Sequence, residues 1–589
     1  MSAVTEEVEV PTAPTASWTR ADTLAAAAIA FGVVLTALVG TQLFLRGDDW
    51  LLLTIVSRPG FGPSDLFVPY ASHVMPFGLS VFWAARAFGG ATPWWLLVGT
   101  GTALGVIGSI FTWACIRMLV GPRVKAVVPF LLVPLAPSLM TAIMWPSPSV
   151  YMTALFAVTA IALWGYLRSR LGHGRSGPIV VTASIVLGLF ASELSLLIPP
   201  MLFVLGMAWF GGQGILGAAK HTWRQTRAMW VGLVAVMVVY LAVYLALARW
   251  AGTLPSVRPS ADVVIEGLIL VALQTLPAMI LGGPWVWNEV MGPVGSLTGP
   301  PVFIAALVAW TVIVLGRRAR WRVWWPLATV LLLTVLALAS ARIATYGPTV
   351  VRNPYYTLGA VSLLAVTLTV AYLPSSLPID RPTRKEPGTP VFVGAACLLI
   401  ISTAVSFVMY SQAVPRTPSR AYLAEARSAL TQPTLNVASP RDAFGSFLYT
   451  DPWDTSQHTF DLAGVTGDWV TVTEDPYMLD GSGRRVRMTV DGEPFVTPEP
   501  CYPIDGRVSL IMPENRDPNW PTFALSYTAE RATTGDVEIA GATIPIEFTP
   551  GDHTVYFVGD GRPPSLTLQA DGVCVREFEV GTARPATQD

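Results

Sequence analysis

Long apolar runs fill the first two thirds of the chain and decide what it can fold into. A helix needs about 20 apolar residues to cross the roughly 30 Å of hydrocarbon in a bilayer. Eleven runs approach that length, at 22–45, 94–120, 126–142, 149–167, 178–194, 197–211, 229–249, 302–316, 323–341, 355–374 and 390–411. The stretch 178–211 fits two short helices or one long tilted helix. These runs predict a polytopic α-helical membrane domain over 22–411, embedded in the lipid bilayer, after a disordered cytoplasmic N-terminus at 1–21.

Charge divides the chain into two regions with different solvents. Only 13% of the residues are charged, about half of what soluble proteins carry. Residues 1–414 hold 24 basic and 13 acidic side chains, a net charge of +11, whereas residues 415–589 hold 13 and 25, a net charge of −12. No basic stripe exists outside the loops between apolar runs, which excludes a nucleic-acid partner.

The loops between the apolar runs predict the orientation in the plasma membrane. Basic residues favour cytoplasmic loops. With the N-terminus inside, the inner loops hold 17 lysines and arginines and the outer loops hold 7. This pattern requires that two further apolar stretches, 73–89 and 261–282, do not cross the membrane. We therefore expect both to be helices in the outer interface; the alternative is that one of them crosses and violates the charge rule locally.

Everything after residue 411 is then exoplasmic (periplasmic). Residues 418–430 show a helical period, and beyond them the apolar period changes to two. Alternating runs at 468–473, 485–490, 507–511, 553–558, 565–569 and 573–578 are separated by turn sequences. This spacing predicts an antiparallel β-sandwich over 412–589, resembling a jelly roll or a carbohydrate-binding module.

The four cysteines fall into two classes. Cys115 and Cys397 lie within predicted spans, where we expect small buried apolar side chains. Cys501 and Cys574 form the single pair in the soluble region. An oxidising exoplasmic compartment favours a disulfide between them.

The loop that follows the first apolar run concentrates polar residues. Asp48 and Asp49 stand directly at the exit of that run, and Asp65 and His73 follow within the same connection. These side chains fit either of two explanations: ordinary interfacial residues beside a helix, or a reactive site. In the second, a carboxylate serves as general base toward an acceptor hydroxyl or holds a divalent cation.

Further candidates come from other outer segments. Glu193 is an ionisable residue at the end of an apolar run, which is either a functional group or an interfacial one. Arg342, Arg352 and Tyr355 lie in one outer loop, where arginine suits phosphate oxygens and tyrosine suits sugar faces or headgroup depth. Trp285 lies in a Gly-Gly-Pro-Trp corner that either lines a substrate groove or anchors the interfacial helix.

Several reaction classes lack their motifs in this chain. It contains no P-loop, dinucleotide fingerprint, H-E-x-x-H or G-x-S-x-G sequence. The matched broken half-repeats expected of a secondary transporter are also missing.

The first span followed at once by Asp48-Asp49-Trp50, the large outer loop with His73-x-x-Pro76, and the many spans resemble the GT-C class of membrane glycosyltransferases. The C-terminal β domain resembles those of actinobacterial cell-wall arabinosyltransferases. The resemblance implies a polyprenyl-phosphate sugar donor, an envelope polysaccharide or glycolipid acceptor, and inversion at the anomeric carbon. It also implies that Asp49, or else Asp48, is the general base, and that Arg342 and Arg352 bind the lipid phosphate.

Two other functions remain open from the sequence. One is a non-catalytic envelope protein that binds or moves a glycolipid with the same architecture. The other is an envelope acyltransferase or ligase that uses His73 or an aspartate as base. Convergence of Asp48 or Asp49, Glu193, Arg342 and Arg352 on one cavity would favour the transferase. A meeting of His73 with a serine or an aspartate would favour the acyltransferase.

Overall fold

The computed structural model describes most of the chain. The described residues are 17–41, 45, 48–58, 60–69, 73–89, 94–174, 176–211, 214–250, 260–289, 293–295, 300–343, 347–377, 387–413, 418–437, 460–461, 465–496, 501–511, 522–539, 542–559 and 565–586. Residues 1–16 of the predicted disordered N-terminus lie outside these ranges.

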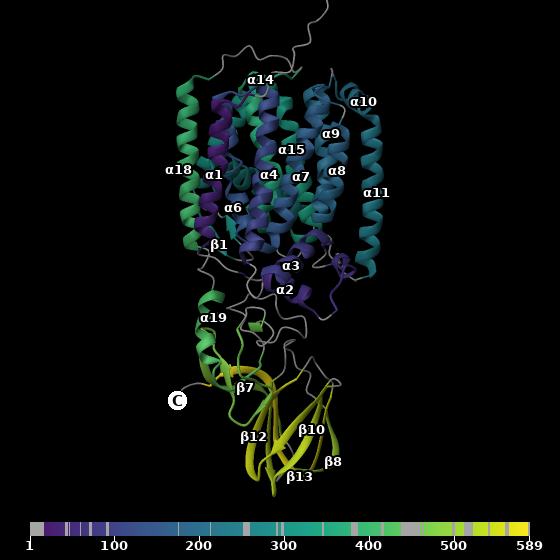
Figure 1. The fold of residues 1–589 in the computed structure, drawn as a ribbon, viewed down its shortest axis with the longest axis vertical. Coiled ribbons are helices and arrows are strands. Elements are labelled where there is room, and N and C mark those ends of the chain that lie inside the picture. Colours follow the sequence, from purple (N-terminus) through teal and green to yellow (C-terminus); the bar gives the residue numbers. More distant parts are fainter. Residues whose placement is uncertain are drawn as a thin grey trace, which may run out of the picture.

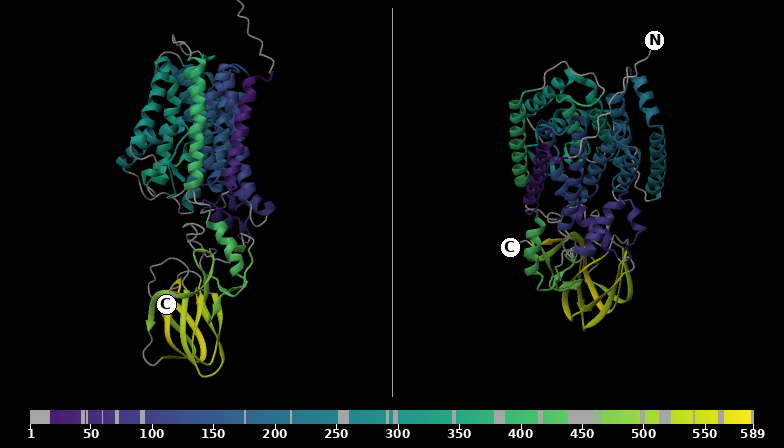
Figure 2. Two further views of the ribbon diagram at one scale, coloured as in Figure 1. Left: turned by 90° about the vertical axis from the view of Figure 1, so that its left-hand side faces the viewer. Right: turned by 45° about the horizontal axis from the view of Figure 1, so that its top comes forward.

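The protein is a multi-pass helical membrane protein with a C-terminal antiparallel β domain (Figure 1). Within the described residues, nine helices are long and apolar enough to cross a membrane. The longer helices are α1 (Arg20–Gly40), α4 (Trp94–Val120), α7 (Pro146–Arg170), α8 (Gly177–Ala191), α9 (Ile198–Phe210), α11 (Arg227–Trp250), α14 (Pro300–Arg320), α15 (Trp325–Leu338), α17 (Leu358–Tyr372) and α18 (Thr389–Ala413). The start of α1 and the β domain lie at opposite ends of the bundle (Figures 1 and 2).

One predicted span is broken. The run 126–142 folds as η2 (Val124–Ala126), α5 (Val127–Leu131) and α6 (Pro137–Ile143). Pro129, Pro134 and Pro137 explain the break, because proline has no backbone N–H to donate within a helix. The short pieces are nevertheless buried among the other helices, where neighbouring protein shields irregular backbone from lipid.

The stretch 178–211 forms two helices, one of the two interpretations left open by the sequence. Between α8 and α9 lies η3 (Glu193–Leu197), a 3-10 turn that begins after Ser192, whose hydroxyl accepts from the Leu194 N–H at 3.3 Å. This turn places Glu193 at the end of the helix pair.

The two stretches predicted as interfacial differ in length. α3 (Pro76–Gly89) lies with α2 (Asp48–Ser57) at the end of the bundle that faces the β domain (Figure 1). The second stretch consists of α12 (Ala261–Leu270), the π-helical turn η4 (Val271–Thr275) and α13 (Leu276–Leu281). Ala261–Leu281 is itself one of the nine described helices long and apolar enough to span, whereas α8 and α14 are counted as shorter apolar helices. The interfacial position of this stretch therefore stays a prediction.

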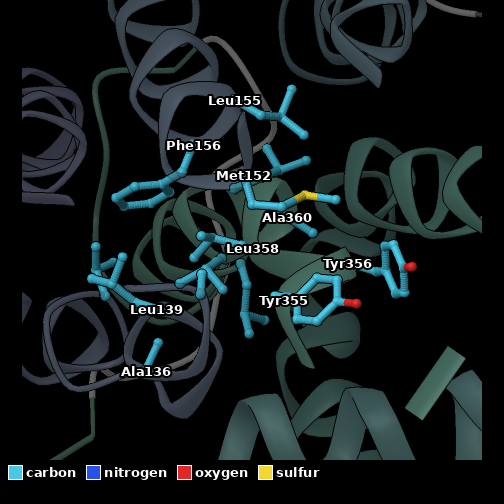
Figure 3. Close-up of a cluster of buried hydrophobic side chains, with 14 of the residues drawn as sticks. Ala136, Leu139, Met152, Leu155, Phe156, Tyr355, Tyr356, Leu358 and Ala360 are labelled. Carbon is cyan, nitrogen blue, oxygen red and sulfur yellow. The ribbon is translucent and has the colours of Figure 1, made fainter. Parts of the chain in front are cut away.

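The bundle core lies where α6, α7 and α17 meet. Leu139 of α6, Leu155 and Phe156 of α7, and Leu358 of α17 are buried there (Figure 3). The turn η8 (Pro354–Thr357) adds Tyr355 and Tyr356, whose rings lie 4.5 Å apart. This packing fixes the segment between α15 and α17 that carries several candidate residues.

The β domain follows α18 through α19 (Pro418–Ala429), the helix predicted at 418–430. Within the described residues, its main sheet has nine strands, all of which pair antiparallel, as predicted. They are β5 (Val472–Thr473), β6 (Tyr477–Leu479), β7 (Arg485–Val496), β8 (Tyr502–Ile511), β9 (Thr522–Ala529), β10 (Thr533–Ile539), β11 (Ala542–Phe548), β12 (Gly551–Val558) and β13 (Ser565–Pro585). Two short strands, β3 (Thr434–Leu435) and β4 (Trp469–Val470), pair separately.

Strand β13 joins the two layers of this domain. The sequence predicts two strands at 565–569 and 573–578, whereas the structure has one strand of 21 residues. Its first half pairs with β8 and β10 and its second half with β7 and β9. Register shifts near Asp571 and Val575 bend the strand, as bulges do where a strand passes between layers. The sandwich is therefore nearly a closed barrel.

The predicted disulfide joins Cys501, just before β8, to Cys574 in β13, with a Cα–Cα distance of 5.6 Å. That distance lies in the usual range for disulfides. Of the other two cysteines, Cys115 is buried as expected, whereas Cys397 is exposed on α18.

Candidate functional site

Three ionisable side chains from distant parts of the chain meet at the end of the bundle nearest the β domain. His73 Nδ1 lies 2.5 Å from Glu193 Oε1, and Arg342 Nη2 lies 2.5 Å from His73 Nε2. Because a guanidinium can only donate, Nε2 is the acceptor, and Nδ1 therefore carries the proton that it donates to Glu193. The arrangement holds one neutral tautomer of His73 between a carboxylate and an arginine.

Each of these side chains stands at an interruption of helical structure. His73 precedes α3, Glu193 opens η3, and Arg342 lies in the π-helical turn η6 (Ala339–Ile343) at the end of α15. His73 and Glu193 are about one fifth exposed, at 18% and 22%. The cluster is thus largely shielded but retains an open side.

Tyr151 of α7 lies beside these three side chains. Its ring stacks on that of His73 with centroids 5.9 Å apart. It interacts electrostatically with Tyr356, Arg342, Asp48 and Glu193. Asp48, Arg342 and Glu193 therefore all lie within electrostatic range of Tyr151, although they lie far apart in the sequence. We call Asp48, His73, Tyr151, Glu193 and Arg342 the Tyr151 cluster.

The two adjacent aspartates occupy different environments. Asp49 is fully buried, and its Oδ1 accepts from the backbone N–H of Ser147 at 2.6 Å. Ser147 lies in the first turn of α7, so the Asp49 carboxylate satisfies an unpaired donor there and faces the positive end of the helix dipole. Asp48 is partly exposed and interacts with Tyr151. The sequence favours Asp49 as base, whereas the geometry gives Asp48 the better access to a substrate.

Within the described residues, Asp65, Trp285 and Arg352 lie outside the Tyr151 cluster, whereas Tyr355 interacts electrostatically with Tyr151 and Arg342. Asp65 Oδ2 accepts from the backbone N–H of Gly62 at 2.7 Å, within its own loop. Trp285 donates from Nε1 to Ser402 Oγ of α18 at 2.7 Å, which anchors the Gly-Gly-Pro-Trp corner to that helix. Tyr355 is buried against Trp145 with ring centroids 6.0 Å apart. Arg352 lines a separate cavity with Thr357.

Sequence reasoning missed two tyrosines of α11. Tyr240 and Tyr244 stack with ring centroids 6.2 Å apart, and both interact electrostatically with Glu193. The Tyr240 hydroxyl is buried and has no hydrogen-bond partner within the described part of the chain. Their spacing of four residues places them on one face of α11, and this was the signal available in the sequence.

An apolar cavity adjoins the Tyr151 cluster. It lies between α7, η3, α9, α15 and α17 and shares Tyr356 with the surroundings of Tyr151. Leu194, which follows Glu193, also lines it, together with Leu155 and Met201. It encloses about 350 Å³ of space, including the part open to the surroundings. A charged cluster beside an apolar cavity suits an amphiphile whose polar group is anionic.

Metal binding was one alternative for the first-loop carboxylates. Within the described residues, no group of three or more His, Cys, Asp and Glu side chains is arranged to hold a metal ion. The hydrogen bonds of His73 instead engage both ring nitrogens with Glu193 and Arg342.

No protein-family model matches the chain, and neither does any curated protein sequence. Among solved structures, the chain is similar to the crystal structure of ArnT from Cupriavidus metallidurans bound to undecaprenyl phosphate. The two share 14% sequence identity and a TM-score of 0.45, over 70% of this chain and 82% of that one. A likeness this distant says nothing about chemistry, which follows from the contacts above.

Proposed function

We propose that the chain is a membrane glycosyltransferase that moves a sugar from a polyprenyl-phosphate donor to an envelope glycan or glycolipid on the outer face of the plasma membrane. The observation that carries this proposal is the convergence of Asp48, Glu193, His73 and Arg342 around Tyr151. The convergence supports a reactive site over scattered interfacial charges. It disfavours a non-catalytic glycolipid carrier, which needs no carboxylate beside an arginine.

Asp48 is the general base in this proposal. Its carboxylate accepts the proton of the acceptor hydroxyl while that oxygen attacks the anomeric carbon of the donor sugar. The bond between the anomeric carbon and the phosphate oxygen breaks, and polyprenyl phosphate leaves with the electron pair. Because attack and departure occur on opposite faces, the anomeric configuration inverts. Partial exposure of Asp48 supports this role, since the base must reach a substrate.

Arg342 stabilises the leaving phosphate. Negative charge grows on the phosphate oxygens as the glycosidic bond breaks, and a guanidinium in a shielded site is well suited to bind it. His73 and Glu193 orient Arg342, because the Glu193 carboxylate fixes the tautomer in which Nε2 accepts from the arginine. His73 and Glu193 are therefore positioning residues for Arg342.

The remaining parts of the substrates fit neighbouring surfaces. The apolar cavity beside Tyr356 suits the first isoprene units of the donor lipid. The β domain lies at the same end of the bundle as α2 and α3 (Figure 1), where it can hold an acceptor glycan. This end is the exoplasmic one if the basic loops are cytoplasmic, which also suits the Cys501–Cys574 disulfide.

The test is transfer of labelled sugar by the purified full chain in lipid nanodiscs. A panel of polyprenyl-phosphate pentoses and hexoses serves as donor, and envelope glycan extract serves as acceptor. Asp48→Asn should reduce transfer about 10²–10⁴-fold. Asp65→Asn is the matched control in the same loop, because its carboxylate accepts from the Gly62 N–H within that loop, and it should retain transfer. Full transfer by a folded Asp48→Asn variant would show that Asp48 is not the general base.

One observation favours a second candidate, an acyltransferase or ligase. A histidine oriented by a carboxylate, as His73 is by Glu193, also activates hydroxyl groups. However, its outer nitrogen accepts from Arg342 rather than from a serine or the acceptor. An assay with separate labels on the lipid acyl chain and on the sugar distinguishes the two functions. Transfer of the acyl label without transfer of the sugar label would replace the first proposal by the second.

A further inference from the structure

A second cavity lies apart from the Tyr151 cluster, and we call it the Arg352 cavity. It is enclosed by α6, η4 and α13, the turns η7 (Pro348–Arg352) and η8, and α18. It contains about 560 Å³ of space between atoms, including the part open to the surroundings. Pro354 and Thr357 of η8 line it, whereas Tyr356 of the same turn lines the apolar cavity. The turn η8 therefore separates the two cavities.

Three polar atoms of the Arg352 cavity are buried without a hydrogen-bond partner in the described part of the chain. They are Arg352 Nε, Gln274 Oε1 and Thr403 Oγ1. Buried polar groups in proteins are normally paired, so an orphaned set needs an explanation. Here the three atoms come from three separate elements, η7, η4 and α18, yet line one space.

The backbone around the Arg352 cavity keeps this space open. Gln274 lies in the π-helical turn η4, a local distortion that is frequent at functional sites. Gly282 has a φ of +78°, and a Cβ built there would approach Thr403 Oγ1 to 2.6 Å. Any larger residue at 282 would therefore fill the space beside the threonine hydroxyl.

The side chains that line the Arg352 cavity indicate which kind of ligand it binds. Among the described residues that line the cavity, Arg352 is the single charged one, and none of them is a carboxylate that could balance it. An anion is needed because an uncompensated charge inside a membrane protein is costly. Gln274 Oε1 is an acceptor and needs a hydroxyl or another donor, and the Thr403 hydroxyl can serve as either. Water would satisfy Gln274 and Thr403 but brings no charge to Arg352.

We propose that the Arg352 cavity binds a phosphodiester headgroup that carries a hydroxyl group, at a site distinct from the Tyr151 cluster. The single negative charge of a phosphodiester matches one guanidinium. Its phosphate oxygens accept from Arg352, and its hydroxyl donates to Gln274. A lipid source fits the position, because Leu398 and Ile401 on the opposite face of α18 are exposed, as lipid-facing side chains are. This site does not depend on the proposed transferase reaction.

The test is lipid binding to the purified full chain, followed by native mass spectrometry during titration. The probes are phosphatidylglycerol, phosphatidic acid, phosphatidylcholine and inorganic phosphate. Phosphatidylglycerol should bind tightest, because it alone combines one negative charge with free hydroxyls. Arg352→Gln should weaken its binding by more than about 10-fold, as expected for loss of a charged hydrogen bond. Thr403→Val, which preserves volume, should weaken it by about 2- to 10-fold, and Arg352→Lys should restore part of the loss.

The outcomes separate this proposal from the transferase. Arg342→Gln is the control, since it lies in the other cluster, and it should leave phosphatidylglycerol binding unchanged. Equal binding of phosphatidylglycerol by wild type and a folded Arg352→Gln variant would overturn the site. Binding of inorganic phosphate or phosphatidic acid as tight as phosphatidylglycerol would overturn the hydroxyl contact with Gln274. Loss of sugar transfer in Arg342→Gln would bear on the proposed transferase, whereas phosphatidylglycerol binding by the Arg352 variants tests the Arg352 cavity.

Discussion

The bundle and the β domain use charged side chains in opposite ways. On the β domain, the ion pair Arg584–Asp491 joins the neighbouring strands β13 and β7, and Arg507–Glu538 joins β8 and β10 across β13; the side chains of these pairs are 46–66% exposed. In the bundle, Glu193, His73 and Arg342 meet in a shielded cluster assembled from distant segments. Exposed pairs contribute about 0–1 kcal/mol, whereas a charge within a membrane domain is costly and is normally functional. The same residue types therefore indicate solubility in one region and chemistry in the other.

The bundle also contains a charged contact with a structural role. Asp22 at the start of α1 accepts from Trp113 Nε1 at 2.9 Å and pairs with Arg117 at 3.1 Å, both on α4. This contact joins two helices at the end opposite the β domain and has no adjoining cavity among those described. A shielded charged contact is therefore not sufficient evidence for a functional site. The Tyr151 cluster differs because it adjoins an apolar cavity and contains a partly exposed carboxylate, Asp48, that a substrate can reach.

After replacement of the proposed base Asp48, the largest expected effect falls on Arg342. Arg342→Gln should reduce sugar transfer about 10²–10³-fold, the usual effect of removing a donor that stabilises developing negative charge. Arg342→Lys should recover part of the rate, because it keeps the charge but loses the fork geometry. Arg507→Gln on the β domain is the matched control and should leave transfer unchanged. Equal losses of sugar transfer in Arg342→Gln and Arg507→Gln would contradict the different roles of charged residues in the bundle and the β domain.

The next largest effect concerns the disulfide of the β domain. Replacing Cys501 and Cys574 by serine opens a crosslink between residues 73 positions apart. Loss of a crosslink of that length should lower the free energy of unfolding of the domain by about 4 kcal/mol. Hydrogen exchange of the full chain should then speed up across β7 to β13 while the bundle helices keep their protection. Unchanged exchange in these strands would show that the sheet holds without the crosslink.

A smaller effect is expected at Asp49. Asp49→Ala removes the acceptor of the Ser147 N–H at the start of α7 and should lower stability by about 1–2 kcal/mol. Thermal unfolding in detergent measures this loss. Because α7 also carries Tyr151, some reduction of transfer at elevated temperature should accompany it. A variant as stable as wild type would mean that Asp49 does not cap the helix.

The smallest effect concerns pH and the turn between β6 and β7. Burial acts to raise the pKa of Asp480, but hydrogen bonds from Ser482 and Arg484 outweigh it and hold that pKa below its usual value. The folded state thus favours the carboxylate, so its stabilisation is present above pH about 4 and is lost as the pH falls through the lower folded pKa. Asp480→Asn should cost about 1 kcal/mol at neutral pH. Its unfolding curve should converge with that of wild type in acid.

The sequence predicted what depends on local composition. The run 94–120 coincides with α4, because a continuous apolar stretch without proline has one stable form in lipid. The prediction of one span at 126–142 is wrong, because hydropathy does not take into account that proline has no backbone N–H to donate within a helix. The two β-strands predicted at 565–578 proved to be one, because bulges interrupt the alternation of side chains without ending the strand.

The site required contacts that no local pattern encodes. Residues 73 and 193 are separated by 120 positions, so their pairing depends on how α3 and η3 pack. Asp48 and Asp49 have the same chemistry and adjacent positions, and only the path of α7 decides which one is buried. Arg342 and Arg352 lie ten positions apart and look equivalent in sequence, yet Arg342 bonds His73 whereas Arg352 lines a separate cavity.

The central claim is that the two adjacent aspartates have separate roles, Asp48 in chemistry and Asp49 in structure. The most direct measurement is a single-turnover rate of sugar transfer for Asp48→Asn and Asp49→Asn, each paired with its unfolding temperature. We expect Asp48→Asn to lose about 10²–10⁴-fold in rate at an unchanged unfolding temperature. Asp49→Asn should instead unfold at a lower temperature and retain most of its rate below it. A stable Asp49→Asn without activity, beside an active Asp48→Asn, would contradict the account.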